Sequence, residues 1–343
     1  MSGGVDSSMA ATALKNRGYD TSGVFLNLGQ VNYTEALKSA KKVAEKIGIS
    51  LKIVNLRKKF KKEIIAYFLR EYKEGGTPNP CVQCNKDIKF GLLLKLAEKL
   101  KFDYLATGHY IRRKPSFLQD GHQGKSFRKE GFRLLQAKDK SKDQSYFLYN
   151  LTQKQLGKLL FPLGDYFKKE IKKMADELRL PHLKKESQDI CFLNCEHNEY
   201  LKKHLKFKKG KITTADGKII GEHNGLPLYT IGQRHGFSKG GRVPYYVVAK
   251  NIKKNLLIVA SKADEEKFYK KEIKIKKVNW ISGYAPDIKE TYKARIRYRQ
   301  SLQNCRIKNN KVIFLRPQRA VTPGQSLVIY DGQTLLGGGI IVV

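Results

Sequence analysis

The loop formed by residues 1–8 constrains this chain more than any other stretch. Two adjacent glycines and three serines, in the segment SGGVDSS, come directly before a helical run over residues 9–15. Glycine lets the backbone approach a ligand closely, serine hydroxyls donate hydrogen bonds, and a helix start offers free N–H groups at the positive end of its dipole. A turn followed by a serine-capped helix would give the same pattern without a ligand. Because the lysine of a Walker A motif is absent, we expect an anion site of another type.

Strand-like and helix-like apolar spacings alternate through the first part of the chain. Strands are expected over residues 19–27, 51–56 and 102–107, and helices over residues 35–47, 60–72 and 88–100. This alternation predicts an α/β fold with a doubly wound parallel sheet, in which ligands bind at the carboxyl ends of the strands. A strand should also lead into the first loop, whereas the loop begins at Met1. This favours a start codon further upstream over the loss of a central strand.

The pattern changes along the rest of the chain. Residues 117–133 predict an insertion or hairpin, and residues 143–160 and 165–178 predict helices. From about residue 207 short apolar stretches separated by turn residues indicate a small β module, and from residue 272 period-two alternation indicates a β-barrel or sandwich. We therefore expect an α/β domain over residues 1–200, a small central β domain over 201–270 and a C-terminal β-barrel over 271–343.

The charge balance indicates a polyanionic partner. Sixty-eight Lys and Arg residues against thirty-one Asp and Glu residues give a formal net charge of +37, and a protein this basic usually binds nucleic acid. A lysine-rich genome that spreads lysine over solvated faces would give the same count. The sequence has no apolar run near the ~18 residues of a membrane helix and no secretory signal, so we expect a cytoplasmic protein.

Five cysteines are too few and too unevenly spaced for a secreted disulfide framework, which favours reactive or metal-binding thiols. In the segment TPNPCVQCNK, Cys84 lies directly before a predicted helix. The helix N-terminus together with Lys86 and Lys89 should lower the pKa of this thiol, whereas the alternative is an inert buried cysteine. Cys191, in SQDICFL, has apolar neighbours and by itself would be interpreted as a core cysteine.

Eight motifs occur in a fixed order along the chain. They are SGGVDSS, TPNPCVQCNKDIKFG, ATGHY, KDQSYFLYNLTQ, SQDICFL, GEHNGLPLYTIGQR, RIRYRQ and AVTPGQ. The first resembles the pyrophosphate loop of the ATP pyrophosphatases, and the whole set resembles the tRNA-specific 2-thiouridylase family nearly end to end. The resemblance implies that ATP and Mg²⁺ adenylate the C2 oxygen of the wobble uridine, the first anticodon nucleotide. A cysteine persulfide then delivers sulfur to C2, and pyrophosphate and AMP are released.

The resemblance also implies that the domain over residues 1–200 binds an adenine nucleotide and carries the catalysis, that the barrel over 271–343 binds tRNA, and that single residues have specific roles. Cys191 would carry the persulfide, and Cys84 would act as acid/base or nucleophile and close a disulfide with Cys191 after transfer. The positions that match ATP contacts, with Asp6 also a candidate Mg²⁺ contact, are Ser2, Gly3, Gly4, Val5, Asp6, Ser7, Ser8, Leu26 and Gly108. The positions that match the segment facing the flipped target base are Asn79, Pro80 and Cys81. The positions that match tRNA contacts are His109, Lys142, Asp143, Gln144, Arg297, Tyr298 and Gln325.

One departure from the family opens an alternative mechanism. Cys81 stands where many relatives have aspartate, so that Cys81, Cys84 and Cys191 form a three-thiol set that could ligate an iron–sulfur cluster. Two further hypotheses stay open: a basic RNA-binding module in which these cysteines and Cys195 hold a structural zinc ion, and an amide-forming ATP pyrophosphatase. For the thiouridylase hypothesis, the expected partners are tRNAs for Lys, Glu and Gln and a cysteine desulfurase or sulfur-relay protein, and a monomer is expected.

Overall fold

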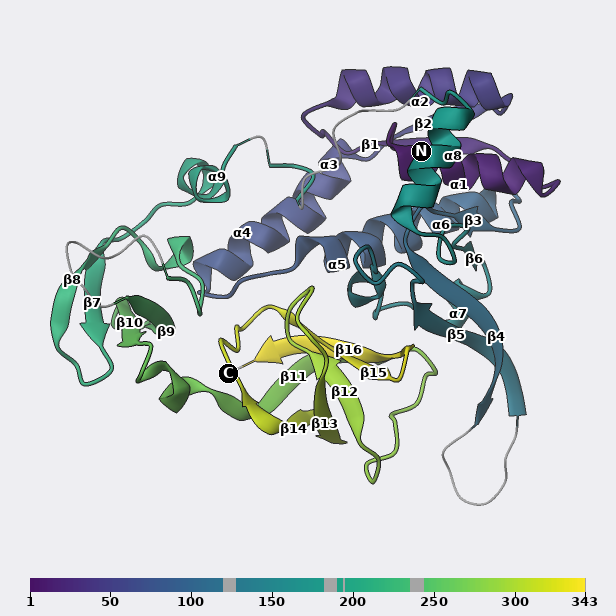
Figure 1. Ribbon diagram of the computed structural model, residues 1–343. Coiled ribbons are helices and arrows are strands. Elements are labelled where there is room, and N and C mark those ends of the chain that lie inside the picture. The colour runs from purple at the N-terminus through teal and green to yellow at the C-terminus, as the bar shows by residue number, and fades with distance from the viewer. Residues whose placement is uncertain (120–127, 182–189, 194, 235–243, 343) are drawn as a thin grey trace.

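The computed structural model describes residues 1–119, 128–181, 190–193, 195–234 and 244–342. It begins with an α/β domain, drawn in purple to teal in Figure 1. The elements of its first part are α1 (Val5–Asn16), β1 (Gly23–Asn27), α2 (Tyr33–Ile47), β2 (Leu51–Asn55), α3 (Arg57–Phe60), the π-helical segment η1 (Lys61–Ile65), α4 (Ala66–Lys73), α5 (Pro80–Cys84), the π-helical segment η2 (Asn85–Leu92), α6 (Leu93–Lys99) and β3 (Leu105–Ala106).

Parallel strand pairing and helix packing build this domain, although the described parallel strands do not join into the one doubly wound sheet that the apolar pattern predicts. Strand β1 pairs in parallel with β2, and β3 pairs in parallel with β6 (Leu159–Leu160), so the described parallel strands form two pairs. Helix α2 ends where Gly48 adopts the left-handed conformation (φ 63°), as a helix-terminating glycine should. Helix α1 packs on α8 (Lys168–Glu177) through the apolar residues of both helices. None of the helices in the described ranges is long and apolar enough to cross a membrane.

The helix predicted over residues 143–160 is wrong. This stretch contains the short 3-10 helix η3 (Ser145–Phe147), the four-residue helix α7 (Gln153–Leu156) and β6. Side chains explain the interruptions, because the Asp143 carboxylate accepts hydrogen bonds from backbone N–H groups and Thr152 begins a new helix through a capping box with Gln155. The hairpin alternative for residues 117–133 is confirmed by β4 (Ile111–Gln119) and β5 (Arg128–Gln136), and its residues 120–127 lie outside the described ranges.

Two β modules follow the α/β domain (Figure 1). After α9 (His197–His204), the central module is a four-stranded sheet of order β8-β7-β10-β9, with β7 (Gly210–Thr214), β8 (Ile219–His223), the 3-10 helix η4 (Leu226–Leu228), β9 (Tyr245–Asn251) and β10 (Leu256–Ser261). The C-terminal module comprises the 3-10 helix η5 (Glu265–Phe268), β11 (Lys270–Trp280), β12 (Tyr292–Arg295), β13 (Gln303–Lys308), β14 (Lys311–Gln318), β15 (Ser326–Asp331) and β16 (Thr334–Val342).

The C-terminal strands close into a barrel. Their order is β11-β14-β13-β12-β15-β16, and pairing of β11 with β16 completes the circle. The period-two alternation that predicted these strands places one row of apolar side chains inside, where Ile273, Val312, Phe314 and Leu327 are almost fully buried. Strand β5 of the hairpin also pairs with β16, which joins the barrel to the α/β domain. The predicted order of an α/β domain, a small β module and a C-terminal β-barrel is therefore confirmed.

Candidate active site

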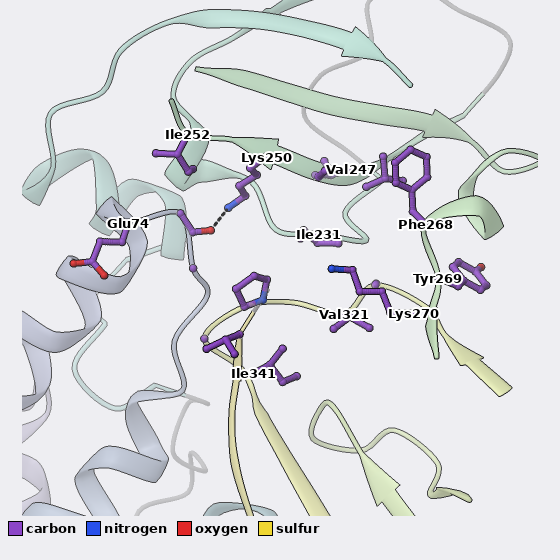
Figure 2. Close-up of a pocket in the computed structure, with 18 of the residues that line it drawn as sticks. Glu74, Ile231, Val247, Lys250, Ile252, Phe268, Tyr269, Lys270, Val321 and Ile341 are labelled. Atoms are coloured by element: carbon purple, nitrogen blue, oxygen red, sulfur yellow. Dashed lines mark hydrogen bonds between the residues drawn. The ribbon is translucent and has the colours of Figure 1, made fainter. Parts of the chain in front are cut away.

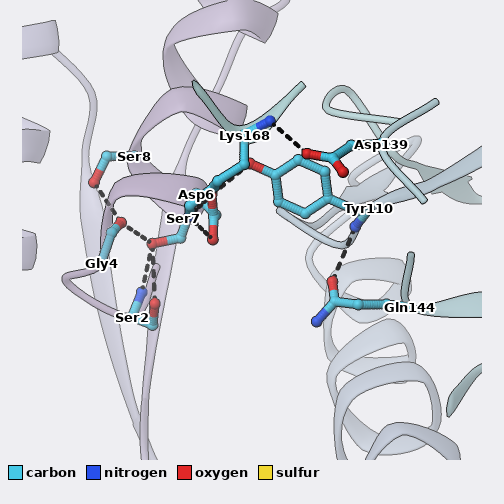
Figure 3. Close-up of polar contacts among 9 residues, drawn as sticks. All are labelled: Ser2, Gly4, Asp6, Ser7, Ser8, Tyr110, Asp139, Gln144 and Lys168. Atoms are coloured by element: carbon cyan, nitrogen blue, oxygen red, sulfur yellow. Dashed lines mark hydrogen bonds and ion pairs between the residues drawn. The ribbon is translucent and has the colours of Figure 1, made fainter. Parts of the chain in front are cut away.

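The SGGVDSS loop is an ordered turn that leads into α1. The Ser7 hydroxyl accepts a hydrogen bond from the Ser2 N–H at 3.0 Å and donates one to the Gly4 carbonyl at 3.0 Å, and the Ser8 hydroxyl donates to the same carbonyl at 3.0 Å (Figure 3). Gly4 is the N-cap of α1, and no side chain caps the helix. The first-turn N–H groups of α1 therefore have no capping partner, which suits an anionic ligand.

Two glycines make this geometry possible. Gly3 has φ +77°, and a Cβ at this position would lie 2.5 Å from the Ala36 carbonyl oxygen. A Cβ on Gly108 would lie 2.7 Å from the backbone carbon of Asp6, so that the segment after β3 touches the start of α1 directly. The structure thus brings Gly108 to the loop, as the resemblance implies. Leu26 lies half-buried at the end of β1, where its carbonyl accepts a hydrogen bond from the Gln30 side chain at 3.1 Å.

Asp6 is held by two residues for which the sequence analysis had no role. The Lys168 ammonium lies 2.6 Å and 2.7 Å from the two carboxylate oxygens, and the Tyr110 hydroxyl donates to one of them at 2.8 Å (Figure 3). The Lys168 side chain is 9% exposed and that of Asp6 36%. Asp139 fixes the start of α8 by accepting a hydrogen bond from the Lys168 N–H at 3.0 Å. Tyr110 belongs to the ATGHY motif. The sequence around Lys168, by contrast, does not indicate that this lysine contacts Asp6.

Tyr110 also connects the loop to the KDQ motif, residues 142–144. Its N–H donates to the Gln144 side chain at 2.9 Å, and the Gln144 N–H donates to the Tyr110 carbonyl at 2.9 Å (Figure 3). Asp143 is buried and accepts hydrogen bonds from Ala137 and Ser145, and Lys142 is half-buried. Asp143 therefore shapes this segment from inside the protein.

The prediction that a helix N-terminus lowers the pKa of Cys84 is wrong. Helix α5 begins at Pro80, with Asn79 as its N-cap, and runs directly into η2, so Cys84 lies within a continuous helical segment. The Cys84 thiol is buried in an apolar cluster that includes Phe192. Burial raises the pKa of this thiol to about 12, although the positive charge of Lys89 opposes the rise.

Cys191 is exposed and lies close to Cys84. Negative charge on Cys191 or on Cys81 contributes to the raised pKa of the Cys84 thiol. The three thiols are therefore neighbours. The surrounding protein raises the pKa of Cys191, and Lys89 opposes this rise as well. All five cysteines are free thiols. The core-cysteine interpretation of Cys191 is wrong, because its side chain is accessible for chemistry.

Lys89 has a larger role at the site than its position in the sequence indicates. It lies in η2, is half-buried, and its charge acts on both thiols and on His109. His109 is buried beside Phe90, hydrogen-bonds to the Thr107 hydroxyl at 2.8 Å, and has a pKa lowered by burial and by Lys89. Lys89 therefore stands between the thiols and the segment that contacts the loop, in a π-helical turn of the kind that often marks functional sites.

The three-thiol set does not form a metal-binding group. Cys81, Cys84 and Cys191 all belong to the described part of the chain, and within it no group of three or more His, Cys, Asp or Glu side chains is arranged to hold a metal ion. The residues therefore do not fit a resident iron–sulfur cluster or a structural zinc ion in this conformation.

The predicted target-base segment is anchored by the C-terminal barrel. The Gln325 side chain donates to the Thr77 carbonyl at 2.9 Å, and the Thr77 N–H donates to the Pro323 carbonyl at 2.8 Å. Asn79 is half-buried and precedes α5 as its N-cap. Pro80 is buried, and Cys81 is half-buried at the start of α5. Gln325 thus fixes the approach to residues 79–81.

Arg297 and Tyr298 lie on the side of the barrel that faces the other domains. The Arg297 guanidinium donates to the carbonyls of Ile231 and Ala320, at 2.6 Å and 3.1 Å, and to the Thr322 hydroxyl at 2.7 Å. It therefore links the central module to the barrel. Tyr298 packs on Phe147, with 4.5 Å between the ring centroids.

Comparisons with known proteins agree along the whole chain. Three family models match in succession: a tRNA methyl transferase HUP domain over residues 1–195, a tRNA methyl transferase PRC-barrel domain over 198–261 and an aminomethyltransferase β-barrel domain over 270–341. The chain is 40% identical over 361 residues to the tRNA-specific 2-thiouridylase MnmA of Nitrosomonas europaea, with 100% of this chain and 96% of that protein covered. It is 41% identical over 361 residues to the protein of the same name from Thiobacillus denitrificans, with 99% and 98% covered.

A solved structure shows a weaker likeness. The U34-tRNA thiolase NcsA of Methanococcus maripaludis, determined with its four-iron four-sulfur cluster, is 22% identical, with a TM-score of 0.35 over 56% of this chain and 58% of that one. This likeness is too weak to transfer the ligands of that protein. The family models and the full-length relatives, by contrast, match every domain of the chain. The protein belongs to the tRNA-specific 2-thiouridylase family.

Proposed function

We propose that this protein catalyses the ATP-dependent 2-thiolation of the wobble uridine in tRNA. The observation that supports the proposal is that one residue, Lys89, acts electrostatically on both thiols and on His109, which follows the glycine that packs against the anion-binding loop. Gly108 packs against the start of α1, and its neighbour His109 lies within reach of the charge of Lys89. The same charge acts on Cys84 and Cys191. An enzyme that activates an oxygen and then replaces it with sulfur needs both functions side by side.

Activation of the oxygen would take place at the loop. ATP phosphates would lie against residues 2–8, where the uncapped N–H groups of α1 and the serine hydroxyls stabilise negative charge. Magnesium would enter with ATP, because both Asp6 oxygens are occupied by Lys168 and Tyr110 and the described residues offer no resident metal site. The C2 oxygen of uridine would attack the α-phosphate and release pyrophosphate, which leaves an O-adenylated base with AMP as a good leaving group.

Sulfur transfer would then use the two cysteines. The terminal sulfur of a Cys191 persulfide would attack C2, and the C2–oxygen bond would break as AMP leaves. Cys84 would next give up its proton and attack the Cys191 sulfur, forming the Cys84–Cys191 disulfide and releasing the thiocarbonyl of 2-thiouridine. Exposure of Cys191 allows a donor protein to load it, and burial of Cys84 keeps its thiol protonated until the attack.

The partners follow from the same chemistry. tRNA supplies the uridine and the polyanion that the net charge of +37 would attract. A cysteine desulfurase or a sulfur-relay protein would load Cys191, the substrates would be the tRNAs for Lys, Glu and Gln, and the enzyme would work as a monomer in the cytoplasm. The contacts proposed for His109 and Asp143 would act through neighbouring residues, because both side chains are buried.

An assay of the product tests the function. Unmodified lysine tRNA would be incubated with the protein, ATP and a persulfide donor, and the nucleosides would be separated and weighed by mass spectrometry. The proposal predicts 2-thiouridine, formed only with ATP and with equal release of pyrophosphate. A methylated uridine in its place, or ATP hydrolysis without modified tRNA, would exclude the proposed reaction. Binding of tRNA with tightly held zinc and no turnover would support the RNA-binding module instead.

A further inference from the structure

A cavity of about 670 Å³ lies where the three domains meet. The α/β domain contributes the end of α4 and the turn after it, residues 71–76, and the central module contributes Ile231 and residues of β9. The barrel module contributes Phe268, Lys270, Val321 and Ile341 (Figure 2). A cavity of this size can hold a nucleotide-sized ligand.

Four lysines line the cavity beside its apolar walls, namely Lys250, Lys267, Lys270 and Lys276. Ile231, Val247 and Val321 line it with hydrocarbon, and Figure 2 shows the ammonium groups of Lys250 and Lys270 directed into it. Lys250 donates to the Gly75 carbonyl at 3.3 Å, a weak contact, and among the described residues neither Lys250 nor Lys270 forms an ion pair. Burial lowers the pKa of Lys250 to about 8.

Within the described residues, none of the three glutamates that line the cavity forms an ion pair with Lys250 or Lys270. Glu265 is committed to Arg319, with 2.8 Å between Oε1 and Nε. Glu74 lies at the rim in Figure 2, and Glu71 borders the same turn. A fourth lining residue, Lys267, is paired with Asp264 at 2.7 Å and therefore contributes little positive charge to the interior.

The cavity adjoins the residues already proposed to contact tRNA. Arg297 donates to the carbonyls of Ile231 and Ala320, and both of these residues line the cavity. Gly75, which Lys250 contacts, is two residues from Thr77, which Gln325 holds. An anion that draws Lys250 away from Gly75 would therefore act on the turn that leads to residues 79–81.

We propose that this cavity binds one phosphate-bearing nucleotide. Its phosphate would pair with Lys250 and Lys270, and its base or ribose would pack on the apolar wall. The favoured source is a nucleotide of the bound tRNA other than the wobble uridine, because Arg297 holds two residues that line the cavity, Ile231 and Ala320. In this respect the inference rests on the proposed function. A free nucleotide such as AMP has the same chemistry, and the test separates the two sources.

The test compares tRNA affinity over a range of salt concentrations for Lys250→Met, Lys270→Met and the control Lys267→Met. A lysine that neutralises a phosphate contributes about 0.9 to the slope of log K against log salt. Each of the first two variants should lower the slope by about that amount and weaken binding several-fold at moderate salt, whereas Lys267→Met should match wild type. Lys270 is exposed at the start of β11, so its variant separates charge from folding. Unchanged slopes in both test variants would overturn the tRNA assignment.

Equilibrium dialysis with AMP supplies the second arm. Loss of one AMP site in the Lys250→Met and Lys270→Met proteins, with unchanged tRNA slopes, would assign the cavity to the free nucleotide. If neither the salt slopes nor AMP binding change in the two variants, the cavity does not bind a nucleotide. A protein with lysine-dependent tRNA slopes but no thiolation would retain the cavity site and lose the proposed function. If the protein thiolates tRNA while both variants keep the wild-type salt slopes and the wild-type AMP binding, the proposed function stands and the cavity site is lost.

Discussion

Lys168 forms a two-point contact with Asp6: its ammonium lies 2.6 Å from one carboxylate oxygen and 2.7 Å from the other. The two residues come from α8 and from the first turn of α1, helices that also pack against each other through apolar side chains. The orientation of Asp6 beside the anion-binding loop is therefore set by a residue far away in the sequence, with Tyr110 as the other partner.

The first prediction concerns this pair. Lys168→Met should leave Asp6 without its cation and turn its carboxylate toward the phosphate site, where negative charge repels ATP. We expect kcat/KM for ATP to fall on the order of tenfold or more, while Lys168→Arg should retain most activity. Steady-state pyrophosphate release at varied ATP measures this effect. Equal activity of the methionine variant and wild type would show that Lys168 does not position Asp6.

The second prediction concerns Lys89. Its charge opposes the rise in pKa that the surrounding protein causes at Cys84 and Cys191, so Lys89→Met should raise the pKa of both thiols. Alkylation of the exposed Cys191 by iodoacetamide should therefore slow at neutral pH, and its pH profile should move to higher pH. Lys86→Met is the matched control, because Lys86 is exposed and no effect of its charge on either thiol is evident. Identical profiles for Lys89→Met and wild type would contradict this role.

The third prediction links stability to pH at Lys250. Its folded-state pKa of about 8 lies below the ordinary value of 10.5, so the unfolded chain binds more protons between these values. This lysine therefore destabilises the fold fully below about pH 8, and the penalty disappears as the pH rises toward 10.5. Lys250→Met should raise the unfolding free energy at neutral pH and remove this part of the pH dependence. Denaturant titrations at several pH values measure both, and a less stable methionine variant would contradict the expectation.

The fourth prediction concerns Gly108. A Cβ at this position would meet the Asp6 backbone at 2.7 Å, so Gly108→Ala should displace the start of α1 and abolish most ATP-dependent pyrophosphate release. Gly221→Ala is a suitable control, because its Cβ would meet only the Ile212 side chain at 3.9 Å. The control should keep wild-type activity. Retention of activity by Gly108→Ala would show that the loop tolerates the displacement, or that ATP binds elsewhere.

Local sequence signals predicted those parts of the fold that local physics determines. The loop glycines, the glycine that ends α2 and the period-two strands of the barrel are all where the pattern placed them. Local signals failed where residues distant in the sequence determine the environment of a side chain. Cys84 has a raised pKa because Phe192 and other residues remote in sequence bury it, and the helix that was expected to begin after it in fact begins at Pro80.

Long-range pairs explain what the sequence analysis missed at the site. The Lys168–Asp6 contact joins two helices whose residues give no local indication of a partner, and Lys89 gains its importance from three groups that folding brings around it. Arg297 and Gln325 matched tRNA contacts by resemblance, yet their hydrogen bonds in the fold run to other domains of the same chain. Motifs therefore located the site, whereas the structure was needed to assign the supporting contacts.

Anaerobic thiolation of unmodified lysine tRNA by wild type, Cys191→Ala, Cys84→Ala and Cys81→Asp, with bound iron quantified in each sample, tests the central claim most directly. The proposed mechanism predicts 2-thiouridine from wild type without iron, none from Cys191→Ala, loss of turnover in Cys84→Ala and retained activity in Cys81→Asp. Activity that tracks bound iron and requires all three cysteines would contradict the persulfide mechanism and assign sulfur activation to a cluster.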